Sequence, residues 1–385
     1  MNSRERILTT LQHKEPDRIP IDLGGIRSTG ISIKAYEKLK NYLRLKGGDI
    51  EIYDFFQQIV RPDERILKKI GADVYAIITN PSKNWKLKLM EDEDSYSYID
   101  EWGIKYKMAK KGGWCYYMVN HPLVKVKKAE ELDDYNWPDP YDPGIMEGLK
   151  EKVKDLYHNT DYALLANSPT GGILEHSQAL RGFDTFLMDM LLNPELAMAI
   201  MDKVLEFQMG FWDNVLGAIG KYVQIVQIGD DLGSERGPLI SLDLYKKLLK
   251  PKHKELCQFI KKKANAYLLL HACGSVSEFI PDFIDNGIDI LNPVQTSAKN
   301  MDTKALKKEY GDRITFWGGG CDTQRILPYG TEKEVEEEVR MRVSHLGPGG
   351  GFVFTQVHNI TAEVPPKNII AMYKAVKKYG KYPLR

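Results

Sequence analysis

One imidazole and two thiols stand at the ends of two apolar segments of the sequence. Segment 268–270 is followed by His271 and Cys273, and segment 314–317 is followed, after three glycines, by Cys321. In a strand, residues i and i+2 point to the same side, so His271 and Cys273 can face one point in space. Zn²⁺ prefers nitrogen and sulfur ligands, and a site with three protein ligands keeps a position open for a substrate. These residue types therefore predict a catalytic zinc site.

The same three residues also allow a purely structural interpretation. His271 could be a hydrogen-bonded core histidine, and both cysteines could be small buried apolar residues. The His-x-Cys spacing is short and common, so it does not decide between the two by itself. The position of Cys321 at the end of a second predicted strand favours the metal.

Three further polar residues follow neighbouring predicted strands. Gln295 ends the strand 288–294 and is predicted as a weak fourth ligand through its amide oxygen; a hydrogen bond to the adjacent backbone explains it equally well. Asp230 and Asp231 follow the strand 222–228, where a carboxylate can act as a base, anchor a substrate or orient His271. An aspartate can also cap the next turn, so we expect one of the two to be functional and the other structural.

Other polar residues near predicted strand ends are expected to contact a substrate: Asp22, Arg27, Asn80 and His358. A core role explains His358 equally well. On the helix after the third strand, Glu175 and Arg181 are expected to form a structural pair. Cys115 and Cys257 are expected to be structural as well.

The elements that must position these residues alternate between strand and helix. About eight predicted strands, the first at 21–24 and the last at 350–355, are separated by helices such as 174–190 and 194–218. This rhythm predicts an α/β protein with a parallel sheet, closed into a single (β/α)₈ barrel domain over residues 1–385. An open doubly wound sheet is the alternative. In a barrel, the strand ends that carry the polar residues meet on one face.

Residues 95–120 follow a different period. Aromatic residues largely alternate with others on both sides of Lys110-Lys111-Gly112-Gly113, which reads as a turn. The pattern predicts an antiparallel β insertion. This insertion could line the pocket, form a docking surface, or simply cover the barrel.

Composition narrows the function classes. The chain has 54 Lys and Arg against 53 Asp and Glu, which argues against nucleic acid or a membrane surface as a partner held by bulk charge. Four cysteines in 385 residues, with no signal-peptide core at the start, indicate a reducing cytoplasm. No dinucleotide-binding, Walker or Gly-x-Ser-x-Gly motif is present. The oligomeric state stays open, and a homodimer is compatible with the sequence.

Several motifs together resemble the uroporphyrinogen decarboxylase superfamily, which includes cobalamin-dependent methyltransferases. The resemblance covers nearly the full length, and its fold implies a (β/α)₈ barrel. The motifs that carry it are Arg4-Glu5-Arg6-Ile7-Leu8, Pro16-Asp17-Arg18-Ile19-Pro20, Asp100-Glu101-Trp102-Gly103, Leu180-Arg181-Gly182, Gly229-Asp230-Asp231-Leu232-Gly233, His271-Ala272-Cys273-Gly274, Gly318-Gly319-Gly320-Cys321-Asp322-Thr323 and Pro365-Pro366-Lys367-Asn368-Ile369.

Within this superfamily the resemblance points to the methyltransferase branch. Decarboxylases are metal-free, with an Arg-rich N-terminal motif and an aspartate at an early strand end. Here the N-terminal segment 22–27 holds the single arginine Arg27, and the second strand ends at Asn80. The methyltransferases have His-x-Cys and a distant Cys that bind zinc, and His271, Cys273 and Cys321 are similar to that pattern.

The resemblance implies a zinc enzyme that moves a methyl group between a small substrate and the cobalt of a corrinoid. None of the eight histidines has Asp two places before it, so the corrinoid motif Asp-x-His-x-x-Gly is absent and we expect a separate corrinoid protein as partner. O-demethylation of methoxylated compounds is the favoured direction, and transfer to a thiol comes second. The alternatives are a decarboxylase-type carbon–carbon lyase and a metal-binding protein without this catalysis.

Overall fold

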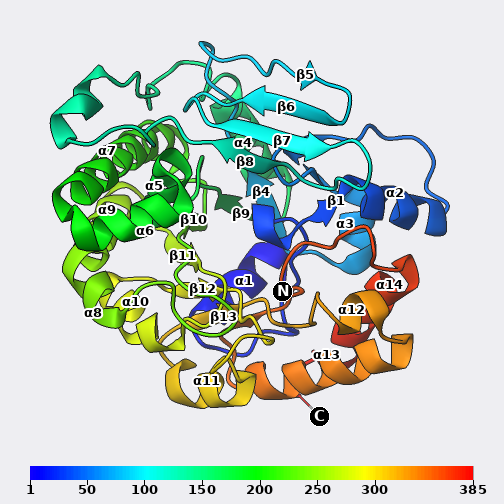
Figure 1. Ribbon diagram of the computed structural model, residues 1–385. Helices are drawn as coiled ribbons and strands as arrows, with labels where there is room; N and C mark the ends of the chain where they lie inside the picture. The colour runs from blue at the N-terminus through cyan, green and yellow to red at the C-terminus, as the bar shows by residue number, and fades with distance from the viewer. Residues whose placement is uncertain (385) are drawn as a thin grey trace.

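A parallel sheet forms the centre of the molecule. The computed structural model describes residues 1–384. Within them the sheet has seven parallel strands in the order β14-β13-β12-β11-β10-β9-β4 (Figure 1). The strands are β4 (Val74–Ile77), β9 (Ala163–Ala166), β10 (Ile225–Gly229), β11 (Tyr267–His271), β12 (Ile290–Asn292), β13 (Thr315–Trp317) and β14 (Phe352–Val353).

The segment around Ile21 closes this sheet into a barrel. Ile21 bridges Phe354 in parallel beyond β14, and its carbonyl accepts a hydrogen bond of 2.8 Å from the Asp73 amide just before β4. The segment thus occupies the eighth strand position between the two sheet edges. The predicted (β/α)₈ barrel is confirmed, and the open sheet is excluded.

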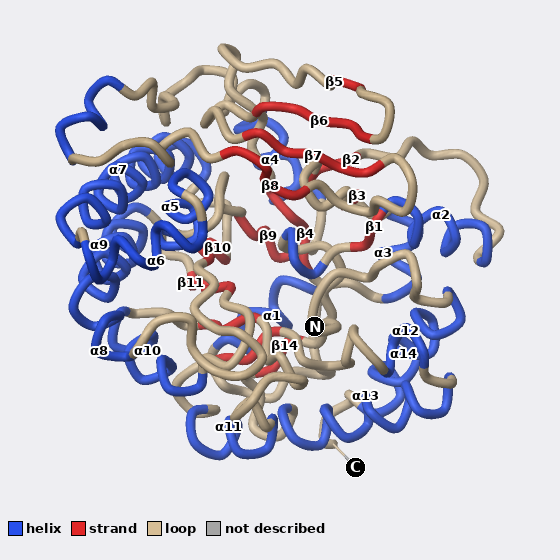
Figure 2. Tube along the Cα trace, in the orientation of Figure 1, coloured by secondary structure: helices blue, strands red, loops and turns tan. Residues whose placement is uncertain are grey.

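Helices surround the barrel, as the blue outer layer of Figure 2 shows. The predicted helix 174–190 is broken into two because Gly182 adopts φ +97° between them. The helices are α1 (Ser3–Leu11), α2 (Ile33–Tyr42), α3 (Glu64–Ile70), α4 (Leu149–Asn159), α5 (Ile173–Arg181), α6 (Phe183–Leu192), α7 (Pro194–Ile219), α8 (Leu242–Leu244), α9 (Lys250–Lys263), α10 (Ile280–Asn286), α11 (Thr303–Tyr310), α12 (Ile326–Tyr329), α13 (Glu332–Leu346) and α14 (Pro366–Tyr379). No helix in the described part of the chain combines the length and apolarity needed to cross a bilayer.

Alternation along the strands decides which side chains fill the barrel. Leu165, Leu269 and Trp317 belong to the compact cluster inside it, whereas Leu268 and Leu270 pack outward against the helices. Since i and i+2 share a face, His271 points to the same side as Leu269 and stands at the carboxyl end of the barrel interior. The sequence pattern thus placed His271 on the correct face.

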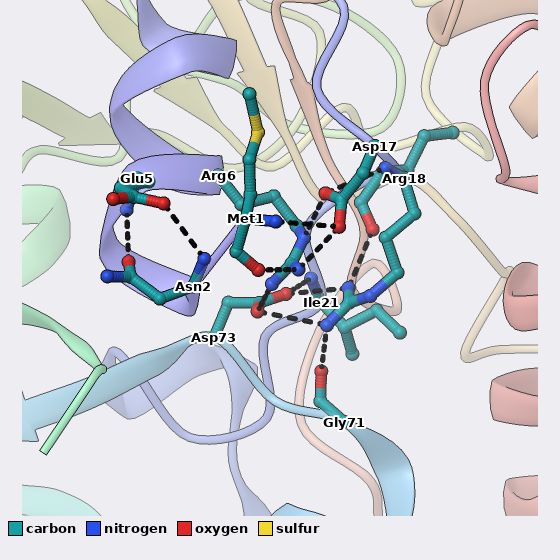
Figure 3. A network of polar contacts seen from close by, with 10 residues as sticks. Met1, Asn2, Glu5, Arg6, Asp17, Arg18, Ile21, Gly71 and Asp73 are labelled. Carbon is teal, nitrogen blue, oxygen red and sulfur yellow. Dashed lines mark hydrogen bonds and ion pairs between the residues drawn. The ribbon is translucent and has the colours of Figure 1, made fainter.

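The opposite end of the barrel is fastened by an ionic network, drawn in Figure 3. Asp73, fully buried before β4, accepts from Arg6 Nη1 at 2.6 Å and from Arg18 Nη1 at 2.7 Å. Its Oδ2 also accepts from the Ile21 amide at 2.8 Å. The motif residues Arg6 and Arg18 therefore anchor the closing segment to β4 and take no part in the chemistry at the other end.

The predicted antiparallel insertion is present. Strands β5 (Met90–Glu91), β6 (Ser95–Ile99), β7 (Lys105–Ala109) and β8 (Tyr117–Asn120) form an antiparallel sheet, which lies at the top of Figure 1. A second small sheet, which the sequence pattern did not predict, holds β1 (Ile31–Ser32), β2 (Ile52–Asp54) and β3 (Ile59–Val60).

Candidate metal centre and the cavity beside it

His271 is held in a defined orientation at the end of β11. Its Nδ1 lies 2.6 Å from Asn292 Oδ1 and 2.9 Å from Ser28 Oγ. The Asn292 amide nitrogen donates to the Trp317 carbonyl at 2.8 Å, which fixes the amide oxygen toward His271. Because this oxygen only accepts, Nδ1 carries the ring proton and Nε2 keeps a free lone pair. That is the tautomer of a metal-binding histidine.

Cys273 and His358 join His271 at this point. One ligand atom from each of the three residues lies within 4.8 Å of the others. The His271 Nε2 is 3.4 Å from the Cys273 sulfur, and the two imidazole centroids are 6.0 Å apart. Burial and the neighbouring His271 lower the pKa of His358 to about 4, so its ring is neutral near pH 7 and able to bind a metal. The set of two nitrogens and one sulfur fits a Zn²⁺ ion with a position left open.

The two consecutive aspartates have separate tasks. Asp230 is fully buried and accepts from the Leu174 and Glu175 amides at the start of α5 and from His253 Nε2 at 2.8 Å. It cannot reach a substrate, so its predicted catalytic role is corrected to a structural one. Asp231 is the residue of the pair that faces the centre.

Asp231 contacts two of the three candidate ligands. Its Oδ1 accepts from the Cys273 amide at 2.8 Å and lies 3.8 Å from His271 Nε2. Burial, together with the charges of Asp231 and Glu175, raises the pKa of the Cys273 thiol well above its usual value. A cation at the centre would oppose this shift by stabilising the thiolate.

Cys321 lies elsewhere, and its predicted place among the ligands is corrected. Its thiol is buried in the core between barrel and helices, 3.6 Å from Glu338 Oε2 on α13. The cause is the glycine run after β13, where Gly318 and Gly319 adopt φ +91° and +80° and turn the chain away from the alternation of the strand. His358, predicted as a substrate contact, stands in the third position.

Three other predicted site residues, Gln295, Asp22 and Asn80, form hydrogen bonds with other groups of the protein. Gln295 Oε1 accepts from the Gly274 amide at 2.8 Å, which is the backbone alternative to a ligand role. Asp22 is fully buried, with Trp317 Nε1 and Thr29 Oγ1 as donors, and burial raises its pKa to about 6. Asn80 donates to the Glu147 carbonyl at the surface. Asp22 and Asn80 therefore do not contact a substrate in the cavity, and both predictions are corrected.

A cavity of about 520 Å³ opens beside the candidate centre. Asp231, His271 and His358 lie at one part of its wall, and the predicted substrate residue Arg27 also lines it. The insertion, the loop that leads into it and the segment after β2 supply much of the rest. We call these residues the aromatic wall: Phe55, Phe56, Trp85, Tyr98, Trp102 and Tyr106. The insertion thus lines the pocket, one of the three roles that its sequence allowed.

Four acidic residues of the cavity lining, Asp54, Asp100, Glu101 and Glu175, were not predicted as site residues. Glu175 lines the cavity, and burial with Asp231 and Asp230 nearby raises its pKa above the usual range. Arg181 pairs with Asp189 at 2.7 Å, so the expected pair with Glu175 is wrong. Glu101 also lines the cavity. The motif Asp100-Glu101-Trp102-Gly103 was the available signal, but it indicated a family and not a position.

Several proteins of known structure have folds similar to this chain. A methyltransferase from Methanosarcina mazei has a similar structure, with a TM-score of 0.66 and 16% identity over 98% of this chain and 99% of that chain. A β-glucosidase mutant gives a TM-score of 0.41 with 11% identity over 95% of this chain and 96% of that chain. A GH113 β-1,4-mannanase gives 0.38 with 9% identity over 94% and 99%. No curated protein matches the chain.

The model of one protein family matches most of the sequence. It is described as uroporphyrinogen decarboxylase (URO-D), and the match spans residues 97–379. That range includes most of the insertion, both aspartates, and the three residues of the candidate centre. The chain therefore belongs to the uroporphyrinogen decarboxylase family.

Proposed function

We propose that this protein is a zinc-dependent methyltransferase that moves a methyl group between a small substrate and the cobalt of a corrinoid held by a separate protein. The observation that carries the proposal is the approach of His271, Cys273 and His358 to within 4.8 Å of one another beside a cavity. Bound zinc would supply Lewis acidity that eases loss of a methyl group from oxygen or sulfur. The favoured substrate is a methoxylated compound, with a thiol second.

The chain's own residues support this chemistry in two ways. Asp231 holds the Cys273 backbone and stands beside His271, so it keeps two ligands in position. Glu175 lines the cavity and keeps its proton to higher pH than an ordinary glutamate, because burial and two aspartates disfavour its charge. It can therefore deliver that proton from its carboxyl group to an oxygen that leaves as an alkoxide.

The lining of the cavity argues against the family's other chemistry. A pocket for the acetate side chains of a porphyrinogen needs basic groups. Within residues 1–384, Arg27 is the only arginine or lysine of the lining, and its Nε already lies 3.6 Å from Asp54. The likeness to the Methanosarcina mazei methyltransferase favours methyl transfer as well.

Methyl transfer to free cobalamin tests the proposal. Zinc-loaded protein is incubated with cob(I)alamin and a panel of methoxylated compounds and methyl thioethers, and methylcobalamin is followed by its absorbance. We expect a signal with at least one donor. It should be lost in Cys273→Ser and kept in Cys257→Ser, a matched control buried on α9. Zinc-loaded protein that yields no methylcobalamin across the panel would contradict the proposal.

A further inference from the structure

Four rings of the aromatic wall form one packed unit. Tyr98 and Tyr106 face each other across β6 and β7 with ring centroids 4.9 Å apart. Phe55 packs on Tyr98 at 5.3 Å, and Phe56 packs on Tyr106 at 5.3 Å. Rings in such a wall present faces and edges to a ligand, and the negative face of an aromatic ring attracts a cation.

The charges on the lining have one dominant sign. Five carboxylates line the cavity, from Asp54, Asp100, Glu101, Glu175 and Asp231, and Arg27 is the one guanidinium in the described chain that faces them. Arg27 is engaged by Asp54 and by the Ser168 carbonyl. The positive charge of a metal at the candidate centre would be balanced by the negative charges of the Cys273 thiolate and of Asp231 beside it. The carboxylates under the insertion are left without a counter-charge.

Of these carboxylates, that of Glu101 has no interaction partner in the described chain. In residues 1–384 its carboxylate has neither a hydrogen bond nor an ion pair, and the charges acting on it are those of Asp100 and Asp142. Asp100, by contrast, accepts from the Trp102 and Ile104 amides and from Tyr106. Glu101 is half-buried, and a carboxylate that is partly removed from water without a partner is less stable in its charged form, so a ligand with positive charge is the partner that fits Glu101.

Two residues that line the cavity, Trp102 and His176, have buried ring nitrogens without a hydrogen-bond partner in the part of the chain that the structure describes. Trp102 and His176 both line the cavity, are 2% and 6% exposed, and lie with ring centroids 4.2 Å apart. Within the described residues, Trp102 Nε1 and His176 Nε2 are buried and have no hydrogen-bond partner. Burial lowers the pKa of His176 to about 3, so this ring adds no positive charge.

We propose that the cavity selects a substrate with a positively charged ammonium group, which lies against the aromatic wall and pairs with Glu101. The methylated oxygen or sulfur is then at the other end of the substrate, toward His271 and His358. This inference rests on the proposed function and names its substrate class: a methyl ether or thioether that carries a quaternary or protonated amine. A neutral methoxyarene stacked on the same wall is the competing occupant.

A pair of isosteres separates charge from shape. Choline carries a trimethylammonium group, and 3,3-dimethylbutan-1-ol has the same shape with carbon in place of the charged nitrogen. Binding of each to the zinc-loaded protein is measured by isothermal titration calorimetry at pH 8. We expect choline to bind at least about fivefold more tightly than the alcohol, which is the range of a cation–π contact with an ion pair. Equal affinities, or no saturable binding of choline, would overturn the inference.

Variants locate the site. Glu101→Gln should weaken choline binding about tenfold and leave the neutral alcohol unchanged, because only the charge is removed. Glu93→Gln is the matched control, since Glu93 is exposed in the turn before β6 and lies off the cavity. Trp85→Leu on the aromatic wall should weaken choline binding as well. Anionic 4-methoxybenzoate should bind more weakly than neutral anisole; the reverse order would count against the inference.

The test is independent of the transfer reaction. The same titrations on Cys273→Ser measure cation selectivity in a protein with an impaired metal centre. Choline selectivity that persists in this variant, with no methylcobalamin formed by zinc-loaded wild type from any donor, would overturn the proposed function alone. Methyl transfer from neutral donors with no preference for cations would overturn the substrate class alone.

Discussion

Asn292 and His271 face each other across the parallel strands β12 and β11, and the Asn292 amide oxygen accepts from His271 Nδ1 at 2.6 Å. Neither side chain is free to turn, because the Asn292 amide nitrogen is tied to the Trp317 carbonyl. This contact decides which ring nitrogen of His271 points at Cys273. A residue inside the barrel thus prepares the candidate centre before any metal binds.

Replacing Asn292 should therefore weaken metal binding. Asn292→Leu keeps the volume but removes the acceptor, so His271 loses its fixed tautomer, and zinc affinity should fall about 10- to 100-fold. Competition with a chromophoric chelator measures this affinity. The control is Asn41→Leu at an exposed position on α2, which should bind zinc like the wild type. Unchanged affinity in Asn292→Leu would mean that the hydrogen bond does not orient a ligand.

The two aspartates should respond differently to the same substitution. Asp230→Asn leaves His253 and two α5 amides with a weaker acceptor, so the free energy of unfolding should fall by about 2–4 kcal/mol. Asp231→Asn should keep most of the stability and lower zinc affinity and methyl transfer. Urea denaturation and chelator competition on both variants check the division. Loss of zinc from Asp230→Asn at wild-type stability would contradict this assignment of roles to the two aspartates.

Gly172 is required by close packing at the start of α5. A Cβ at this position would lie 1.8 Å from the Gly229 carbonyl oxygen and 2.3 Å from Asp230 Cγ. Gly172→Ala should lower the free energy of unfolding by about 3 kcal/mol, because backbone would have to move. Gly217→Ala on α7 meets nothing within 4 Å and should instead stabilise by about 0.5–1 kcal/mol. Thermal unfolding of the two variants should shift in opposite directions, and equal shifts would contradict the packing argument.

Glu101 should make stability depend on pH. Burial, with the charges of Asp100 and Asp142, raises the pKa of Glu101 to about 7, above the usual 4.5. Between these values the folded protein binds more protons than the unfolded chain, so the stability that protonated Glu101 contributes is lost as pH rises to about 7. Relative to wild type, Glu101→Gln should therefore gain Tm on going from pH 5 to pH 8. An equal difference between the two proteins at both pH values would show that the carboxyl group is not perturbed.

The sequence predicted the features that follow from periodicity. Alternating strands and helices led to the barrel, and position at a strand end placed His271 at its carboxyl face. The same criterion failed at Cys321, because two left-handed glycines follow the strand and turn the chain away. Position at a strand end did not tell which polar residue reaches the cavity. Arg27 lines it, whereas Asp22 is buried and accepts a hydrogen bond from Trp317.

Residues that meet only in three dimensions could not be assigned. His358 follows Cys273 by a long stretch, and nothing in its neighbourhood distinguishes a ligand from a substrate contact. Glu101 and Glu175 come from the insertion and from α5, and both reach one cavity only because the insertion packs over that side of the barrel. The unsatisfied carboxylate of Glu101 is a property of this packing and has no local signature.

Metal content of three single variants tests the central claim most directly. Wild type, Cys273→Ser, His358→Ala and Cys321→Ser are purified under identical conditions, and bound zinc is measured by mass spectrometry of the metal, with circular dichroism to confirm folding. We expect wild type and Cys321→Ser to hold about one zinc per chain, and Cys273→Ser and His358→Ala to lose most of it. Zinc retained by His358→Ala and lost from Cys321→Ser would contradict this centre.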